Sequence, residues 1–446
     1  MRRIVALCLL LFAASAAAAS KSFEALDDYL GALAKHDRMM LGLAIGQEDE
    51  ISYQGQAGLA VIDGHVPIGP ETRFRIGSIT KTFTSVIVMQ LVEESALSLD
   101  ATLDGWYPAV ENAERITLRQ MMRHRSGIRS FTDDPAYPSF MSRPVTAAEL
   151  EQRIGSYEAV FAPGERYEYS NSNYWLLGRI VERVTGRDYG TALAERIAGP
   201  LGLGHTRYGD ALDEPDEARS YRWTSGGWRL AEETDMSVPG GAGAMVSTSA
   251  DLLRFLRGLF EGELVSADSL AAMTDIEDGY GLGLIAFPYY EKRFYGHNGG
   301  IDGFQSTAAY NPDDGTAIAA LANAVNGDFN GVLVAALDAA YGRPVKIPDF
   351  SAKPVELDPA SLELLIGSYT SDDLPLELRL FMDGGQLMAQ ATDQPAFPVT
   401  PFSETEFRFE PAGIVIRFDA GSLEADAKPA FTLEQGGGSF AFMRKP

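Results

Sequence analysis

The sequence predicts an α+β fold with two domains: a larger one in which an antiparallel sheet packs against an inserted helical region, and a small all-β one at the C-terminus. Three observations lead to this prediction. Strand-like segments stand at both ends of residues 41–321, helical periodicity dominates between them, and only strand patterns occur beyond residue 367. Strands at both ends with helices between them are typical of one sheet built from both ends of a domain.

The larger domain opens with two strands and a long helix. Residues 41–46 and 51–60 are strand-like and flank the polar turn 47–50. A helix follows from Ser78 to about Glu94, because its apolar residues recur at helical spacing. The residues that set this spacing are Phe83, Val86, Ile87 and Leu91.

Helical segments dominate to about residue 275, and strands then return to complete the sheet. We expect helices at 118–123, 173–184 and 251–260, the last of them capped by Ser249. The strands expected after them are 280–287, 293–297, 304–310 and 317–321, and a helix at 329–340 closes the domain.

A proline-rich boundary separates the two domains. Residues 342–354 contain three prolines and lack periodicity. Asp358-Pro359 then begins a short helix, and the strands that follow are typical of a small β-barrel or sandwich. The sequence therefore predicts domains at 20–342 and 358–446, joined by a linker at 343–357.

The N-terminus has the pattern of a secretory signal. Arg2 and Arg3 precede an apolar run at residues 4–14, and small residues follow at 17–19. Because the run is short for a membrane span, we predict cleavage near Ala19 rather than an uncleaved anchor. The signal is thus residues 1–19, and the mature protein is expected in the periplasm or outside the cell, with no membrane span.

Composition excludes several classes of function. With 46% hydrophobic and 22% charged residues, the chain is typical of a soluble globular protein. Its single cysteine, Cys8, lies in the signal, which excludes disulfides and a cysteine nucleophile from the mature chain. A net charge of −25 repels nucleic acid and anionic lipid. No cluster has metal-ligand spacing, so we expect neither metal nor cofactor.

A serine and a lysine one helical turn apart are the strongest chemical signal. Ser78 and Lys81 form the S-x-x-K that opens the first helix. Serine needs a base within reach to become a nucleophile, and residues three apart on a helix share a face. Burial by the apolar helix would lower the pKa of the lysine, as a base requires. The alternative interpretation is that Ser78 only caps the helix.

A second signal is the single Y-x-N of the chain, formed by Tyr169 and Asn171 just before the helix at 173–184. A tyrosine near cations can share or lose its proton and so act as a shuttle. The asparagine amide suits both a substrate carbonyl and the lysine. A turn with a half-buried tyrosine is the alternative.

The third signal is the single H-x-G, in which His297, Gly299 and Gly300 stand at the end of a predicted strand. Glycine at this place lets a substrate backbone approach the strand edge. A glycine hairpin is the alternative. We expect His124 to support its loop, and we expect the glycine-rich residues 240–243 beside the cleft rather than at a phosphate.

Together, and in this order, the three motifs resemble those of the serine β-lactamase and penicillin-binding protein superfamily. The resemblance is to the class C β-lactamase and DD-peptidase branch, since Y-S-N stands where class A enzymes carry S-D-N. It covers about residues 25–342 and implies the β-lactamase/DD-peptidase-like sheet with inserted helices. The tail more loosely resembles lipocalin-like domains. Signature stretches similar to the family's stand at 74–81, 121–127, 200–203 and 296–304.

The resemblance implies a role for each catalytic motif residue. Ser78 would be the acylated nucleophile, and Lys81 and Tyr169 would move its proton and later activate water. Asn171 would orient Lys81 and the substrate amide.

The resemblance also implies a substrate-binding strand. The backbone N–H groups of Ser78 and Gly300 would form the oxyanion hole, and His297 and Gly299 would line the strand on which substrate docks. Class C β-lactamases usually carry lysine where this chain has His297. Because an ordinary histidine titrates near pH 6.5, it would hold a substrate carboxylate less firmly at neutral pH. The alternative is that His297 is a satisfied strand residue, hydrogen-bonded within the protein.

The sequence thus predicts a secreted acyl-serine hydrolase, best described as a D-alanyl-D-alanine carboxypeptidase or D-amino-acid peptidase. Its partner would be a small-molecule or peptide substrate, such as a peptidoglycan stem peptide, and not a nucleic acid. An esterase and a class C β-lactamase share every residue discussed. A non-catalytic penicillin- or peptidoglycan-binding sensor is the alternative from another class, but it would be expected to lack the serine, lysine or tyrosine.

Overall fold

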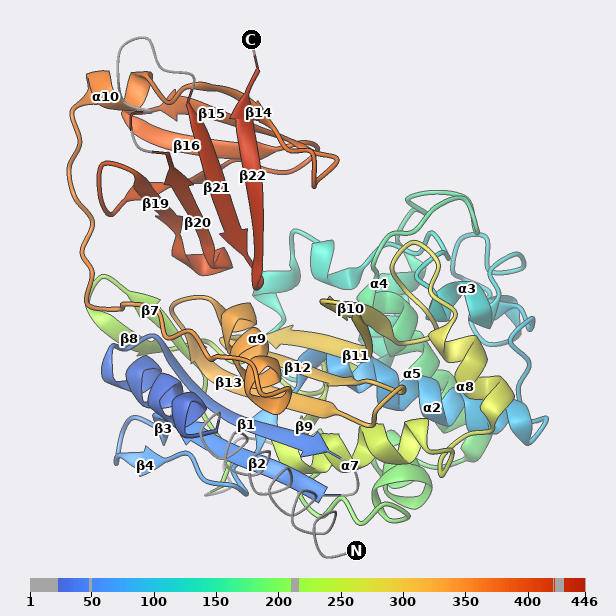
Figure 1. Ribbon diagram of the computed structural model, residues 1–446. Coiled ribbons are helices and arrows are strands. Elements are labelled where there is room, and N and C mark those ends of the chain that lie inside the picture. The colour runs from blue at the N-terminus through green and yellow to red at the C-terminus, as the bar shows by residue number, and fades with distance from the viewer. Residues whose placement is uncertain (1–22, 48–49, 210–215, 420, 422–428, 446) are drawn as a thin grey trace, which may run out of the picture. The chain divides into compact units, whose positions relative to one another are not determined.

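A computed structural model describes residues 23–47, 50–209, 216–419, 421 and 429–445 (Figure 1). The chain divides into two compact units, of which Met39–Val325 is the larger, and the described residues before and after it form the smaller. The predicted signal, residues 1–19, lies outside the described residues. Among the described helices, none is long and apolar enough to cross a bilayer.

The larger unit is built around an antiparallel sheet to which both of its ends contribute. The strand order is β10-β11-β12-β13-β1-β2, and β7, with β8 beside it, adds to β13 in parallel. The bounds are β1 Met39–Gln47, β2 Glu50–Ala57, β7 Tyr221–Thr224, β8 Gly227–Leu230, β10 Ile285–Tyr289, β11 Lys292–Ile301, β12 Phe304–Tyr310 and β13 Ala317–Val325.

The first and last strands of this unit lie side by side in the middle of the sheet. β1 is buried from Met39 to Ile45, and β13 from Ala317 to Ala324. Strands covered on both faces have unbroken apolar runs rather than alternating ones. Helix α7 (Ser249–Phe260) packs against β1, β12 and β13. The predicted α+β fold, with one sheet made from both ends, is confirmed.

The helical region lies between β2 and β10 in the chain, as predicted. Its helices are α2 Thr80–Glu93, α3 Leu118–Met122, α4 Ala147–Gly155, α5 Asn171–Thr185, α6 Tyr189–Leu193, α7 and α8 Ala267–Thr274. Its short strands are β3 Leu59–Val61, β4 Val66–Pro67, β5 Phe74–Arg75, β6 Arg207–Tyr208 and β9 Met245–Ser247. Short 3₁₀ turns include η1 Gly77–Ile79 and η6 Gly240–Ala242.

Helix starts differ from the sequence prediction in three places. α2 starts at Thr80, because the residues before it form the tighter turn η1. α5 starts at Asn171, two residues earlier than expected. The prediction that Ser249 caps α7 is wrong, since Thr248 stands in the extended N-cap position and its hydroxyl accepts the amide of Asp251 at 3.1 Å.

The smaller unit contains a β-barrel-like sheet and short helices. Nine strands run in the order β17-β16-β15-β14-β22-β21-β20-β19-β18, so the two edge strands are consecutive in the chain. Their bounds are β14 Gly367–Thr370, β15 Glu377–Asp383, β16 Gln386–Ala391, β17 Phe397–Pro398, β18 Thr400–Pro401, β19 Glu406–Phe409, β20 Ile414–Phe418, β21 Ala430–Gln435 and β22 Gly438–Arg444. Its core contains the buried rings of Tyr369, Phe407, Phe418, Phe431 and Phe442.

This unit also includes a helix at residues 23–35, α9 (Phe329–Ala340) and α10 (Pro359–Glu363). Two hydrogen bonds of 3.0 and 2.8 Å join the Arg38 guanidinium to the Glu410 carboxylate near the barrel strands. The ring of Tyr29 also stacks on Phe350, in the segment before the barrel. The C-terminal segment of this compact unit thus begins at Asn326, whereas the sequence predicted a linker at residues 343–357.

Candidate active site

Ser78 lies in the tight turn η1, where β5 leads into α2. Gly77 makes this turn possible because its φ of +49° is in the left-handed region. A Cβ on Gly77 would stand only 2.9 Å from the backbone nitrogen of Gly300. The turn leaves Ser78 half-buried and places Lys81 in the first turn of α2.

Lys81 is fully buried, and its amine has three hydrogen-bond partners. Its Nζ lies 2.9 Å from Ser78 Oγ, 2.8 Å from Asn171 Oδ1 and 2.8 Å from the carbonyl oxygen of Ala242. Burial holds the pKa of Lys81 well below its ordinary value. A neutral amine has two N–H groups, which satisfy the asparagine and the carbonyl, and its lone pair then faces the serine hydroxyl. The arrangement suits a general base.

Tyr169 approaches the same serine oxygen. Its hydroxyl lies 2.8 Å from Ser78 Oγ, and Lys81 Nζ is 4.9 Å from the centre of its ring. The sequence suggested a tyrosine that can share or lose its proton near cations. Burial raises the pKa of Tyr169 above its ordinary value, so the phenol keeps its proton in the resting site and donates to Ser78. Ser78 Oγ therefore lies between a base and an acid.

Asn171 orients the lysine from the first residue of α5. Its Oδ1 accepts from Lys81, while its Nδ2 donates to Thr132 Oγ1 at 3.1 Å and its backbone amide donates to Ser130 Oγ at 3.0 Å. The amide expected to bind substrate thus already has a partner in Thr132. We call Ser78, Lys81, Tyr169 and Asn171 the Ser78 group.

The end of β11 runs beside η1 and has an open edge. β10 pairs with β11 only as far as Gly296, so the residues from His297 to Ile301 have β12 on one side only. A Cβ on Gly299 would lie 2.1 Å from the Ile76 carbonyl and 3.0 Å from the Ser78 nitrogen. Only glycine allows this approach, which brings the amides of Ser78 and Gly300 close together.

The ring of His297 is buried, and only 2% of the residue is exposed. Nδ1 contacts the Asn298 carbonyl, which can only accept, so Nδ1 carries the proton and Nε2 accepts from the Tyr280 hydroxyl at 2.9 Å. Burial is the main cause that lowers the pKa of His297 to about 3. The titration near pH 6.5 expected from the sequence is therefore wrong, because the ring is neutral and satisfied inside the protein.

Two expectations about neighbouring segments are met. Residues 240–243 lie beside the site, since the Ala242 carbonyl holds Lys81. His124 supports its loop: its buried Nδ1 accepts the Ser170 amide at 3.1 Å, and its ring lies 4.2 Å from that of Tyr169. Sequence reasoning missed Ser130, Thr132 and Tyr280, because single residues of common types carry no motif.

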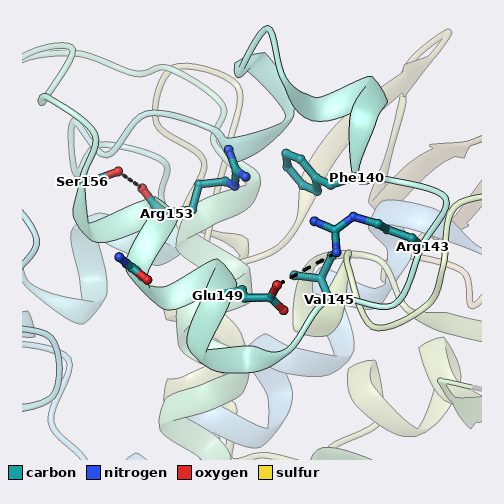
Figure 2. A pocket seen from close by; sticks show the side chains of 7 residues that line it. Phe140, Arg143, Val145, Glu149, Arg153 and Ser156 are labelled. Carbon is teal, nitrogen blue, oxygen red and sulfur yellow. Dashed lines mark hydrogen bonds and ion pairs between the residues drawn. The ribbon is translucent and has the colours of Figure 1, made fainter.

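A separate pocket of about 330 Å³ lies beside α4 (Figure 2). None of its lining residues belongs to the Ser78 group. Two of them are arginines, each facing a carboxylate: Arg153 is 2.9 Å from Asp134, and Arg143 is 4.0 Å from Glu149. The pocket has no nucleophile with a base beside it. Its lining is Phe140, Arg143, Val145, Glu149, Gln152, Arg153 and Ser156.

The fold, together with a serine that lies between a base and an acid, defines the class of this protein as a serine hydrolase with an α+β fold. A family model described as Beta-lactamase matches residues 24–342, and the chain belongs to this family. Within the described residues, no group of three His, Cys, Asp or Glu side chains could hold a metal ion.

The relatives of this chain include penicillin-binding proteins and hydrolases. Penicillin-binding protein 4* of Bacillus subtilis is 24% identical over 87% of this chain and 91% of its own. A D-aminopeptidase of Brucella anthropi is 26% identical over 76% of this chain and 64% of its own. Among solved structures, the D-amino acid amidase of Ochrobactrum anthropi SV3 is 27% identical with a TM-score of 0.65, over 72% of this chain and 98% of its own.

Proposed function

We propose that this protein hydrolyses D-amino-acid peptides or amides through a covalent acyl-Ser78 intermediate. The observation that carries the proposal is the position of Ser78 Oγ, which lies 2.9 Å from a buried lysine amine and 2.8 Å from a tyrosine hydroxyl. A serine between a neutral base and a protonated acid is equipped for acyl transfer.

In the acylation step, Lys81 takes the Ser78 proton as Oγ bonds to the substrate carbonyl carbon. The negative oxygen that forms would be held by the amides of Ser78 and Gly300. The C–N bond then breaks, and the leaving nitrogen takes the proton of Tyr169. This step leaves an acyl-serine, a Lys81 ammonium and a Tyr169 phenolate, whose opposite charges lie close together.

In the deacylation step, the Tyr169 phenolate takes a proton from water as the water oxygen attacks the acyl carbon. The tetrahedral adduct then releases Ser78 Oγ, which recovers its proton from the Lys81 ammonium. All three side chains return to their starting states, so no cofactor is needed.

The open edge of β11 favours an acyl donor without a carboxylate beside the scissile bond. Residues 297–301 of this edge are His, Asn, Gly, Gly and Ile, and the one ring that could be charged, that of His297, is neutral. Amides and esters of D-amino acids fit this edge. The likeness to a D-aminopeptidase and a D-amino acid amidase supports the same class.

A second candidate function, D-alanyl-D-alanine carboxypeptidase, is favoured by Arg222. This exposed residue of β7 donates to the carbonyl of Asp302 at 2.6 Å, two residues beyond Gly300. A permanent cation there is suited to the terminal carboxylate of a stem peptide.

One assay separates these functions. Purified protein is compared on a D-amino-acid amide, a nitrophenyl ester, a D-Ala-D-Ala peptide and a cephalosporin. The leading proposal expects the amide to be turned over best, with Ser78→Ala inactive on all four. Arg222→Gln should lower kcat/KM for the D-Ala-D-Ala peptide alone if the second candidate is right. Turnover of the ester or the cephalosporin alone would identify an esterase or a β-lactamase, and no turnover at all would favour the sensor.

We also propose that the protein is secreted or periplasmic, on the N-terminal pattern of residues 1–19. Amino-terminal sequencing of protein exported by a bacterial host tests this. The expected first residue follows Ala19, and a retained Met1 would contradict cleavage.

A further inference from the structure

We infer that Arg75 and Asp302 form a buried clamp that positions the backbone amides of Ser78 and Gly300 against each other. This inference rests on the proposed function, in which those two amides bind the oxyanion. Arg75 stands three residues before Ser78, and Asp302 stands two residues after Gly300. The ion pair therefore joins the two chain segments that carry the amides.

Asp302 is the anchor on the β11 side. It lies in the turn between β11 and β12, and no part of its side chain is exposed. Its Oδ2 accepts from Arg75 Nη1 at 2.8 Å. Its Oδ1 accepts from the backbone amide and the hydroxyl of Thr234 at 2.9 and 2.7 Å. The carboxylate is thus satisfied on both oxygens, as a buried charge requires.

Arg75 is the anchor on the Ser78 side. Its side chain is 4% exposed, and Nη1 also donates to the Thr234 carbonyl at 2.6 Å. Its backbone is held in β5, which pairs with β9 at Val246. Both charges of the clamp therefore share one further partner, Thr234, and none of the three residues belongs to the Ser78 group.

Between the two anchors, the segments are in direct backbone contact. A Cβ on Gly77 would meet the Gly300 nitrogen at 2.9 Å, and one on Gly299 would meet the Ser78 nitrogen at 3.0 Å. At this spacing, a small shift of either segment would change the directions in which the N–H groups of Ser78 and Gly300 point towards the oxyanion. Oxyanion stabilisation depends on such preorganised donors, so the clamp acts on the reaction without touching substrate.

The backbone of Asp302 allows a test of whether its carboxylate has a use beyond the turn. Its φ is +56°, a left-handed conformation that glycine adopts at lower cost. A residue needed only for the turn would be replaced by glycine with no loss. Asp393, an exposed residue with φ +58° in the smaller unit, provides a matched control for this comparison.

The test compares Asp302→Gly, Asp302→Asn and Asp393→Gly in the full chain. We expect both Asp302 variants to lower kcat for a nitrophenyl ester and the rate of Ser78 labelling by a fluorophosphonate by about 10- to 100-fold, with KM changed little. Asp393→Gly should leave both rates unchanged. An Asp302→Gly protein with wild-type kcat would overturn the clamp.

A second measurement is independent of activity. Hydrogen exchange of backbone amides should be faster in both Asp302 variants at residues 76–79 and 299–304, and unchanged in α7. Faster exchange at 301–304 alone would show a local turn effect and contradict the clamp. If Asp302→Gly does not fold, Arg75→Gln with Asp302→Asn replaces the ion pair by a neutral one for the same measurements. Wild-type protein that is not labelled at Ser78 would refute the proposed function, while the exchange data would still decide the clamp.

Discussion

Lys81 and His297 are two buried basic side chains beside the same serine turn, and only one of them is placed to act as a base. Burial lowers the pKa of both side chains, which favours the uncharged form of each. The two side chains differ in the group that the nitrogen lone pair faces. The Lys81 amine faces the hydroxyl of Ser78, whereas Nε2 of His297 already accepts from Tyr280. Burial therefore favours an uncharged base in both places. The hydrogen-bond partner of the lone pair determines whether that base can accept the Ser78 proton.

Among the changes that test this comparison, removal of the Lys81 amine should have the largest effect. Lys81→Met keeps a long buried side chain but has no basic amine to take the Ser78 proton, so turnover should fall by about 10²–10⁴-fold. The check is kcat/KM on a D-amino-acid amide and an ester, with circular dichroism to confirm folding. Activity close to wild type would mean that another group activates Ser78.

The same lysine predicts a pH dependence. Its pKa is lowered, and only the neutral amine can accept the serine proton. The acylation rate should therefore fall as pH drops below the folded-state pKa of Lys81 and should level off above it. A pre-steady-state burst measured across pH tests this, and a rate that rises towards low pH would contradict the assignment.

Tyr169→Phe should separate amides from activated esters. A leaving amine needs the Tyr169 proton, whereas nitrophenolate leaves without one, so we expect the acylation rate to fall by about 10²–10⁴-fold for the amide and far less for the ester. Rapid-mixing measurements on both substrates give the ratio. An equal loss on the two would mean that Tyr169 does not protonate the leaving group.

For His297 we expect a small kinetic effect, in contrast to Lys81. With a pKa of about 3, its ring does not change charge between pH 5.5 and 8. The ratio of kcat/KM for a carboxylate substrate to that for a neutral ester should then be independent of pH in this range. A ratio that rises towards pH 6 and loses this rise in His297→Gln would show that the histidine binds the carboxylate after all.

His297 should instead affect stability at acid pH. Its folded-state pKa of about 3 lies below the ordinary value of about 6.5, so the unfolded chain binds more protons between these values. The contribution of His297 is fully present above pH 6.5 and is lost as pH falls towards 3. Denaturant unfolding across pH should show a shallower loss in His297→Gln than in wild type. Identical slopes would contradict the low pKa.

The smallest expected effect on turnover is that of deleting residues 343–446. The Ser78 group and the clamp lie within the larger unit, between residues 75 and 302, so kcat/KM for a neutral ester should stay close to that of the full chain. Stability should fall, because Arg38 loses Glu410. Arg38→Ala in the full chain separates that ion pair from the rest of the tail. A folded but inactive truncation would show that the tail shapes the site.

The fold class and the residues of the Ser78 group could be predicted from the sequence alone. Periodicity indicated the α+β class and the order of strands and helices, since these patterns are local. The S-x-x-K and Y-x-N motifs indicated Ser78, Lys81, Tyr169 and Asn171, and the structure links these four residues in one chain of hydrogen bonds.

Only the tertiary structure decided which groups face one another. The Ala242 carbonyl that holds Lys81 is 161 residues away in the chain, and Asp302 is 227 residues from Arg75. The burial that lowers the pKa values of Lys81 and His297 exists only in the folded chain. The hydrogen bond between the Tyr280 hydroxyl and Nε2 of His297, 17 residues apart, likewise forms only there. No local pattern records such contacts, because hydrogen-bond partners and dielectric environment arise only when the chain has folded.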